Sequence, residues 1–229
     1  MKPYYERGGI TIYHGDCREV LPGLPDVDLV LTDPPYGLNI GRSGTIGGSG
    51  TIGGSGIVLP KDYGVASWDE EGMTAEQWDL IRPHGRHSIV WGGNHLADVL
   101  GSSAGMLVWD KRCQNDWNDS FSECEVAWAT FLTRAKCYRH LWAGALRASE
   151  RGKNVREHPT QKPVALMRWC IELAPAPQTI LDPFMGSGTT LRAAKDLGRK
   201  AIGIEIEERY CEIAAKRLEQ EVLPLEVAG

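Results

Sequence analysis

A carboxylate, two prolines and a tyrosine come together at the end of an apolar run, in LVLTDPPYG at positions 29–37. Proline cannot continue a hydrogen-bonded ladder and fixes its own φ, so Pro34 and Pro35 predict a rigid turn. Asp33 and the backbone oxygens of this turn can then face outward together as acceptors, and Tyr36 adds a flat π-surface beside them. Acceptors beside a stacking face suit a planar group that carries an exocyclic amine. A plain Pro-Pro turn with an N-capping aspartate is the alternative, but it does not explain a second Asp-Pro-aromatic turn farther along the chain.

That second turn is DPFMGSGTT at 182–190. Gly186 and Gly188 would let the backbone approach a ligand closely, and a helix N-terminus is expected directly behind them. The lysine of a phosphate-binding P-loop is missing, and the full GxGxxG fingerprint is missing too. Glu205 ends the next predicted strand, where an acid typically binds the ribose hydroxyls of a nucleoside. Together with Asp182 before the turn, this pattern favours a nucleoside-containing cofactor over a plain tight turn.

The apolar patterns also predict the elements that must position these two turns. Strands are predicted at 8–16, 26–33, 87–94, 105–111, 124–131, 178–182 and 199–206. Helices are predicted at 160–174, 189–198 and 207–222. Strands that alternate with helices predict an α/β fold with a largely parallel, doubly wound sheet. Ligands bind beyond the carboxyl ends of parallel strands, so both turns are expected to open on one pocket.

Length and composition suit a single domain, 1–229, with a sizeable core, since 42% of the 229 residues are hydrophobic. The formal net charge of −5 argues against nucleic-acid binding over the whole surface, although it can hide a local basic patch. Six cysteines show no CxxC pair and no zinc-site spacing, so free thiols in a reducing cytoplasm and no metal are expected. The N-terminus lacks the apolar core of a signal peptide, and no run is long enough to span a bilayer.

Two segments depart from the core pattern. Residues 41–58 contain a glycine-rich six-residue repeat that cannot bury enough surface to offset its ordering entropy, so a mobile loop is expected. The regularity of the repeat also leaves open an engineered linker in place of a natural loop. Basic residues crowd the stretch 134–156, where Glu150 is the only acid until its end. A solvated basic face is the simplest interpretation of that stretch unless it adjoins a functional site.

The two turns, taken in this order, resemble the amino-group DNA methyltransferases, which use S-adenosylmethionine. DPPY near the N-terminus and DPFMGSGTT near the C-terminus are similar to the circularly permuted beta class. HPTQKP at 158–163 is similar to the motif directly upstream of the cofactor turn in that class, and GD at 15–16 and GIEI at 203–206 fall where the family places cofactor contacts. The resemblance covers nearly the whole chain. It departs from the family in the short section between the core motifs and in the glycine repeat.

The resemblance implies a Rossmann-like class I methyltransferase fold, circularly permuted, with a short DNA-recognition insert, and transfer of a methyl group from S-adenosylmethionine to an exocyclic amine in double-stranded DNA. Asp33 and the Pro34 carbonyl would accept hydrogen bonds from the amine, and Tyr36 would stack on the extruded base. The catalytic residues implied are Asp33, Pro34, Pro35 and Tyr36. The cofactor residues implied are Asp16 for the adenine, Glu205 for the ribose, Thr160 and Lys162 for the methionine end, and Asp182, Phe184, Gly186, Gly188 and Thr189 in the turn.

DNA contacts are expected from residues 111–157, because this segment lies between the middle strands and HPTQKP. KRCQNDWNDSF at 111–121 interleaves side chains that can read base edges, which makes it the hypothetical recognition segment. The side chains expected to contact phosphates are Arg134, Lys136, Arg139, Arg147, Arg151 and Lys153. The glycine-rich loop is expected to move or become ordered when DNA binds.

Adenine at N6 is the first choice of target, because in this family DPPY goes more often with adenine, whereas a serine in place of Asp33 is more usual for cytosine at N4. The alternatives are N4-cytosine methylation, RNA or protein-amide methylation, and a DNA-binding homologue that has lost catalysis. A homodimer is implied only by the resemblance, and the expected location is the cytoplasm of a bacterial or phage-infected cell.

Overall fold

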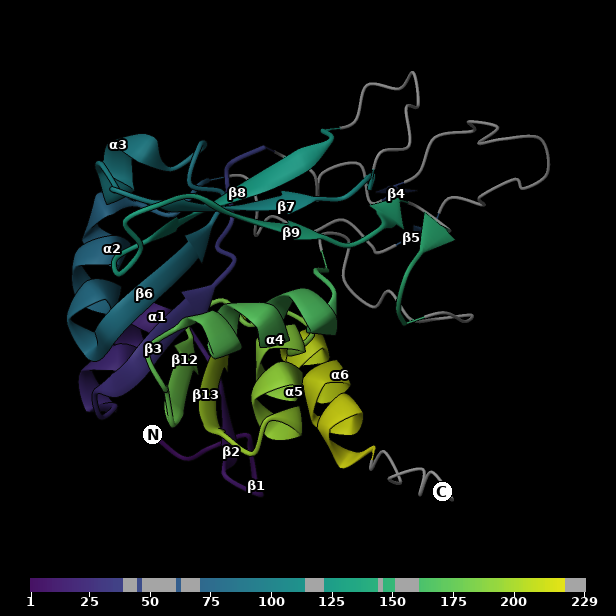
Figure 1. Ribbon diagram of the computed structural model, residues 1–229. Helices are drawn as coiled ribbons and strands as arrows, with labels where there is room; N and C mark the ends of the chain where they lie inside the picture. Colours follow the sequence, from purple (N-terminus) through teal and green to yellow (C-terminus); the bar gives the residue numbers. More distant parts are fainter. Residues whose placement is uncertain are drawn as a thin grey trace.

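The structure, a computed structural model, describes residues 1–38, 45–46, 61–62, 71–113, 122–143, 146–150 and 161–220. Within these residues the centre of the molecule is a nine-stranded sheet with the order β1-β2-β13-β12-β3-β6-β8-β7-β9 (Figure 1). Its strands are β1 Tyr5–Arg7, β2 Ile10–His14, β3 Val27–Thr32, β6 Gly85–Trp91, β7 Met106–Asp110, β8 Cys124–Ala129, β9 Lys136–Arg139, β12 Thr179–Asp182 and β13 Lys200–Glu205.

The five central strands, β2, β13, β12, β3 and β6, run parallel to one another. Antiparallel strands lie toward the edges: β1 pairs with β2, and β8 lies between β6 and β7 and runs against both. β9 pairs in parallel with β7, so its carboxyl end lies at the same edge of the sheet as the carboxyl ends of the central strands. The predicted parallel centre is confirmed. A strand was also predicted at 124–131, but the sequence did not indicate that this strand, β8, runs antiparallel to its neighbours.

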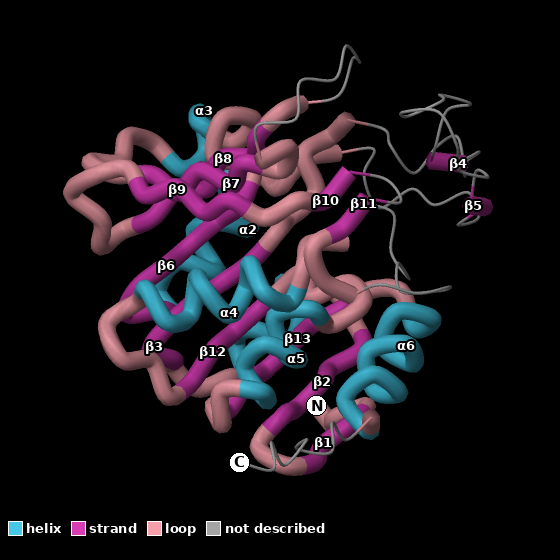
Figure 2. Tube along the Cα trace, turned by 45° about the vertical axis from the view of Figure 1, so that its right-hand side comes forward, coloured by secondary structure: helices cyan, strands magenta, loops and turns pink. Residues whose placement is uncertain are grey.

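Helices cover both faces of the sheet (Figures 1 and 2). They are α1 Cys17–Val20, α2 Ala75–Ile81, α3 Ala97–Leu100, α4 Val164–Leu173, α5 Thr189–Asp196 and α6 Glu208–Glu219. One core cluster joins α4, α5 and α6 to sheet residues that include Leu29 and Leu31. The other joins α1, α2 and α3 to residues that include Val30 and Leu181. Successive residues of β3 therefore serve opposite faces, which is why its apolar run is continuous and why the doubly wound prediction is confirmed.

Local signals account for where several of these helices begin and end. Thr74 and Gln77 form a reciprocal capping box at the start of α2. Helix α5 begins after Gly188, which has the left-handed conformation, and its chain reverses at Gly198, which also has a positive φ. Glu208 lies in the first turn of α6, and Lys216 and Arg217 lie in its last turn, as the helix dipole favours.

The pocket follows from the way the connections leave two neighbouring strands. From β12 the chain passes through α5 on one face, whereas from β3 it continues to α2 on the other face. Strands β3 and β12 pair directly, with Leu29 opposite Ile180 and Val30 opposite Leu181. Such a divergence leaves a crevice at the carboxyl ends of the two strands, which is where α/β proteins bind ligands.

Each predicted strand and helix matches an observed element. Strands β1 and β9, the short helices α1, α2 and α3, and two small hairpins had no predicted counterpart. The hairpins pair β4 Thr45–Ile46 with β5 Lys61–Asp62, and β10 Trp142–Ala143 with β11 Leu146–Arg147. The predicted mobile loop at 41–58 lies outside the described residues except for β4, so its mobility stays a prediction. In the described part of the chain no helix is both long and apolar enough to cross a membrane.

Candidate active site

A pocket of about 560 Å³ lies at the carboxyl ends of the central strands. Asp33 and Tyr36 line one side of it, and Asp182, Gly186 and Glu205 line the other. The two sides are joined directly, because the Thr32 hydroxyl donates a hydrogen bond to Asp182 Oδ1 over 2.7 Å. The expectation that the two turns open on one pocket is therefore confirmed.

The DPPY turn is held in place by a backbone hydrogen bond to one of its carbonyls. The Pro35 carbonyl accepts a hydrogen bond from the Met73 N–H over 3.0 Å, so it does not face a ligand as the sequence suggested. The cause is a chain crossing that sequence spacing cannot show, in which Tyr36 forms an isolated β-bridge with Gly72. No hydrogen bond to the Pro34 carbonyl is present among the described residues. The Pro34 carbonyl therefore remains the backbone acceptor of the turn.

The Tyr36 ring is held in one position by its neighbours. It stacks on His95 with ring centroids 5.1 Å apart and an interplanar angle of 21°. It lies so close to Gly92 that a Cβ at that position would overlap the ring, and Gly92 has a positive φ. The Tyr36 hydroxyl donates a hydrogen bond to Asp33 Oδ1. His95 therefore covers one face of the ring, and stacking on an extruded base stays the predicted role of Tyr36.

Lys162 points toward Asp33. Its ammonium lies 2.5 Å from Asp33 Oδ2, 3.2 Å from Glu125 Oε2 and 3.4 Å from the Tyr36 hydroxyl. The side chain is only 4% exposed and lines the pocket. Its predicted place at the methionine end of the cofactor stays a prediction: in this structure the Lys162 ammonium pairs with the Asp33 and Glu125 carboxylates.

The four charged groups of this side alternate in sign, from Asp33 through Lys162 and Glu125 to Lys111. Burial raises the pKa of Asp33 above its usual value; Lys162 opposes this shift and Glu125 adds to it. Burial also acts to raise the pKa of Glu125, but Lys162 and Lys111 outweigh it and bring that pKa down to about 2. For Lys162, burial acts to lower the pKa, and the two carboxylates more than compensate, so it stays an ammonium ion.

The other side of the pocket holds its carboxylates with neutral donors. Asp182 accepts from the Thr32 hydroxyl and from the Phe184 N–H, and burial raises its pKa to about 6. Glu205 Oε2 accepts from the Gly186 N–H over 2.9 Å, and Oε1 accepts from the Glu207 N–H over 2.8 Å. Burial raises the pKa of Glu205 to about 7. Each Glu205 oxygen accepts one backbone hydrogen bond and keeps capacity for a further donor.

Comparisons with known proteins agree with this geometry. A family model described as DNA methylase, of the N6/N4 type, matches residues 109–216. The Type II methyltransferase M2.DpnII of Streptococcus pneumoniae is 29% identical over 96% of this chain and 93% of its own length. M.ScaI of Streptomyces caespitosus, also a Type II methyltransferase, is 29% identical over 98% of this chain and 86% of its own length.

Solved structures of DNA methyltransferases are also similar to this chain. The crystal structure of the M1.HpyAVI–SAM complex superposes with a TM-score of 0.56 and 26% identity, over 92% of this chain and all of that one. Together the comparisons support an amino-group DNA methyltransferase. The cytosine-N4-specific PvuII DNA methyltransferase, at a TM-score of 0.60 and 17% identity over 97% of this chain and 90% of that one, adds support for the fold alone.

The M1.HpyAVI complex contains S-adenosylmethionine, and the residues that line the pocket of this chain fit that molecule. The pocket volume suits a ligand of nucleoside size or larger. The Glu205 carboxylate retains the acceptor capacity that ribose hydroxyls need. Phe184 and Ile206 supply apolar walls, and Ile206 is 58% exposed, which is unusual for an isoleucine at the end of a central strand.

The remaining predicted cofactor residues divide into three groups. Gly186 and Thr189 line the pocket with Asp182, Phe184 and Glu205. Asp16 lines it too, but its carboxylate caps α1 and is bound by the Arg18 guanidinium at 2.5 Å. The Arg18 hydrogen bonds hold the pKa of Asp16 below its usual value.

The other two groups hold one residue each: Gly188 does not line the pocket, and Thr160 lies outside the described part of the chain. Gly188 does not line the pocket among the described residues: a Cβ there would lie 2.7 Å from the Ala214 Cβ, so this glycine serves the packing of α5 on α6. Thr160 lies outside the described residues. Its predicted role stays a prediction.

The predicted DNA contacts are dispersed over two edges of the sheet. Arg139 ends β9 opposite Asp110, at the edge where the pocket opens. Lys136 begins the same strand, and Arg134 lies beside Gly105 at the start of β7, so both are at the opposite edge. These basic residues therefore lie at two edges of the sheet, because a strand carries its two ends to opposite edges. Their contacts with DNA stay a prediction. Arg151 and Lys153 lie outside the described residues.

The hypothetical recognition segment begins with two residues that bind acids of the protein itself. Lys111 Nζ lies 2.9 Å from Glu125 Oε1, and Arg112 is buried with its Nη1 3.7 Å from Glu123 Oε1. These two side chains are not presented to a base edge, and residues 114–121 lie outside the described part of the chain. Arg147, in β11, lies over the ring of Trp142, in β10, with its guanidinium carbon 4.8 Å from the ring centroid.

Two acidic residues of the site were missed by sequence reasoning. Glu125 is the one charged residue of the apolar strand β8, Cys124–Ala129, and this strand was interpreted only as part of the core. Glu150 was seen only as the single acid of the basic run, yet its Oε1 accepts from the Val164 N–H at the start of α4 over 2.6 Å and its Oε2 lies 3.7 Å from Arg217. Arg217 in turn donates to the Ser187 carbonyl in the glycine turn over 2.8 Å. An acid in an otherwise apolar strand is the one signal that could have identified Glu125.

Proposed function

We propose that this methyltransferase modifies the N6 amine of adenine within a specific sequence of double-stranded DNA. The observation that supports this most strongly is the shared pocket: the Asp33 carboxylate and the Pro34 carbonyl face the same space as Glu205 and the Gly186 turn. An acceptor pair of this kind suits two N–H groups on one nitrogen. Asp33 at the first position of the turn, where a serine would be more usual for cytosine, favours adenine over N4-cytosine.

The amine of a nucleobase is a poor nucleophile, because its lone pair is delocalised into the ring. Hydrogen bonds from its two N–H groups to Asp33 and the Pro34 carbonyl would draw the nitrogen toward sp3 character and aim its lone pair across the pocket. When bound, S-adenosylmethionine supplies an electrophilic methyl group. After methylation the nitrogen is cationic and loses one of its protons, for which Asp33 is the acceptor within the pocket. Tyr36 holds the Asp33 carboxylate in place through its hydroxyl.

DNA would approach the edge of the sheet where the pocket opens. Arg139 is exposed at this edge, and Arg147 lies in the hairpin that follows β9. Cations beside a pocket position a phosphate backbone without reading sequence. We assign the phosphate contacts among the described residues to Arg139 and Arg147, and we leave Arg134 and Lys136 out of the interface.

Order along the chain supports the proposal that the fold is circularly permuted. The strand that carries the acceptor turn, β3, precedes the cofactor strand β12 by about 150 residues in sequence, yet the two are direct neighbours in the sheet. A homodimer and a location in the cytoplasm of a bacterial cell stay predictions. The organisms of the similar Type II methyltransferases support the second of them.

Transfer of labelled methyl groups from S-adenosylmethionine to unmethylated double-stranded DNA, followed by digestion to nucleosides, tests the proposal. The expected product is N6-methyladenine. Label in N4-methylcytosine would overturn the choice of base, and label in RNA or protein but not in DNA would overturn the substrate. Asp33→Ala is the matched control: it should lose transfer by roughly a thousandfold or more while binding S-adenosylmethionine with nearly unchanged affinity.

A further inference from the structure

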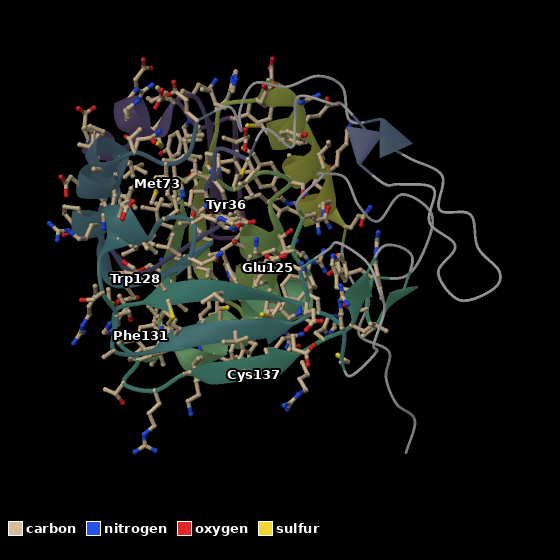
Figure 3. The ribbon with its side chains drawn as sticks, turned by 90° about the horizontal axis from the view of Figure 1, so that it is seen from above. Tyr36, Met73, Glu125, Trp128, Phe131 and Cys137 are labelled. Atoms are coloured by element: carbon tan, nitrogen blue, oxygen red, sulfur yellow. The ribbon has the colours of Figure 1, made fainter. Side chains whose placement is uncertain are left out.

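Glu125 lies behind the acceptor turn and does not line the pocket, yet its carboxylate is fully committed. Oε1 lies 2.9 Å from Lys111 Nζ, and Oε2 lies 3.2 Å from Lys162 Nζ. Lys162 Nζ is in turn 2.5 Å from Asp33 Oδ2. Figure 3 shows the labelled Glu125 and Tyr36 in the interior of the molecule. The proposed base, Asp33, is thus the first of four linked charges that end at Lys111.

This arrangement has a consequence for Asp33. A carboxylate bound to a lysine by itself would be a strong ion pair with a weak tendency to accept a further proton. Lys162 is instead divided between two carboxylates, and its ammonium also lies 5.8 Å from the Tyr36 ring centroid and 5.6 Å from that of Trp91. A buried ammonium shared in this way stays charged but withdraws less electron density from either partner. Replacing buried ion pairs with apolar residues is often neutral or stabilising, so folding stability alone is a weak reason to bury this second carboxylate.

We propose that Glu125 is a positioning residue for methyl transfer: it shares the Lys162 ammonium with Asp33, so that Asp33 keeps a lone pair for the substrate amine and can take up its proton. The proposal rests on the proposed function of Asp33. The groups that face Asp33 are the Lys162 ammonium, the Tyr36 hydroxyl, the Glu125 carboxylate on β8 and, across the switch point, the Asp182 carboxylate. Lys111 acts on Asp33 only through Glu125.

The charge chain makes a prediction of sign. In Glu125→Gln the amide can still accept a hydrogen bond from Lys162, but the negative charge is gone and Lys162 pairs with Asp33 alone. The acid limb of the kcat–pH profile, which reports the base in the ternary complex, should then move to lower pH by about half a unit or more, and kcat at its plateau should fall roughly tenfold to a hundredfold. In Lys111→Gln the opposing charge is lost, and the acid limb should move to higher pH.

Four variants are measured together: Glu125→Gln, Lys111→Gln, Glu125→Asp and a matched control. Glu123→Gln is the control, because Glu123 lies two residues before Glu125, its side chain is 76% exposed, and among the described residues its carboxylate pairs with Arg112. Glu125→Asp keeps the charge and should restore most of kcat even if Glu125→Gln is poorly folded. A readout independent of turnover is the titration of the Asp33 carboxyl carbon by 13C NMR, assigned by its disappearance in Asp33→Asn. The affinity for S-adenosylmethionine should change less than about twofold in every variant.

The outcomes separate this inference from the proposed function. Opposite shifts for Glu125→Gln and Lys111→Gln, with Glu123→Gln unchanged, support a positioning role. Shifts of the same sign, or a reduced kcat with the pH profile and the Asp33 titration unmoved, would mean that Glu125 acts on folding alone and would overturn the inference. A wild-type enzyme that transfers no methyl group would instead refute the proposed function, and the NMR titration would still report whether Glu125 tunes Asp33.

Discussion

The two sides of the pocket bury carboxylates by opposite means. On the cofactor side, Asp182 and Glu205 are surrounded by hydroxyl and N–H donors, and burial raises their pKa values to about 6 and about 7. On the acceptor side, Asp33 and Glu125 are surrounded by two lysine ammonium groups. The same residue type is thus kept in one place by neutral hydrogen bonds and in the other by charge.

The difference fits what each side has to bind. Ribose hydroxyls are neutral donors, and a carboxylate held only by neutral groups can accept them without breaking an ion pair. The acceptor side must handle an amine that turns cationic and then loses a proton, so a fixed pattern of charges prepared before the reaction is of more use there. The comparison predicts that charge deletions will be costly on the acceptor side, and that pH will matter more on the cofactor side.

The largest effect is expected from Lys162→Met. This change leaves Asp33 and Glu125 facing each other without their shared cation, and deleting one partner of a buried ion pair costs about 3–5 kcal/mol of stability. The rate of methyl transfer should fall roughly a hundredfold or more. Chemical denaturation and single-turnover assays measure the two effects. Lys216→Met is the control, because Lys216 is an exposed helix residue paired with Glu212, and a substitution there should alter stability by less than about 0.5 kcal/mol. Equal effects of both variants would remove the distinction between the two sides.

The next effect concerns pH on the cofactor side. Folding raises the pKa of Glu205 from its ordinary 4.5 to about 7, so its neutral form is favoured in the folded state. The stability that this contributes is complete below pH 4.5 and is lost as the pH rises through about 7, a change of roughly 3 kcal/mol for this group. Glu205→Gln should flatten that part of the pH dependence of unfolding without cofactor.

Glu208→Gln, an exposed acid in the next helix, should leave that pH dependence unchanged. A wild-type protein that gains stability between pH 5 and pH 7, with Glu205→Gln following the same curve, would contradict the assignment.

A smaller effect tests the packing of the cofactor turn. Gly188 and Gly198 both have positive φ values, but a Cβ at Gly198 meets nothing, whereas a Cβ at Gly188 would lie 2.7 Å from that of Ala214. Gly198→Ala should therefore cost about 1 kcal/mol for the left-handed backbone alone. Gly188→Ala should cost a further 1–3 kcal/mol for overpacking. Urea denaturation of the two variants gives the difference directly, and equal costs would mean that α6 yields freely at this contact.

The smallest effect is expected at the DNA edge. Arg139→Glu and Arg147→Glu should each weaken DNA binding by roughly tenfold at low salt and reduce its salt dependence, because each removes a cation near the pocket opening. Arg134→Glu is the matched control, since Arg134 is an exposed arginine at the opposite edge of the sheet. Fluorescence anisotropy over a salt series measures all three. A loss with Arg134→Glu equal to that of the other two would place DNA on a different face.

The sequence was informative where local pattern and chemistry coincide. The apolar run before Asp33 and the run before Asp182 could be only buried strands, and parallel strands bring their carboxyl ends to one edge, so the shared pocket was predictable. Helix α5 between two turn glycines was predictable for the same reason.

Contacts between distant segments were not predictable. The Met73 N–H that occupies the Pro35 carbonyl, and the two carboxylates that share Lys162, come from segments separated by roughly 40 to 130 residues, and no spacing rule links them. The placement of β8 between β6 and β7 decides that Glu125 reaches Lys162 behind the acceptor turn, and this pairing depends on the whole sheet. The charge pattern of 134–156 was visible, but the edge that each cation occupies depended on β9, which had not been predicted.

The central claim is that cofactor and target base meet in the pocket between the acceptor turn and the glycine turn. The most direct test is a crystal structure with a non-reactive analogue of S-adenosylmethionine and duplex DNA that contains the recognition sequence. The predicted result is an extruded adenine with its N6 atom within hydrogen-bond distance of Asp33, facing the donor position at roughly 3–3.5 Å, with the ribose of the analogue on Glu205. An analogue bound away from Glu205, or a base that enters on a face of the molecule other than the one that carries Asp33, would contradict it.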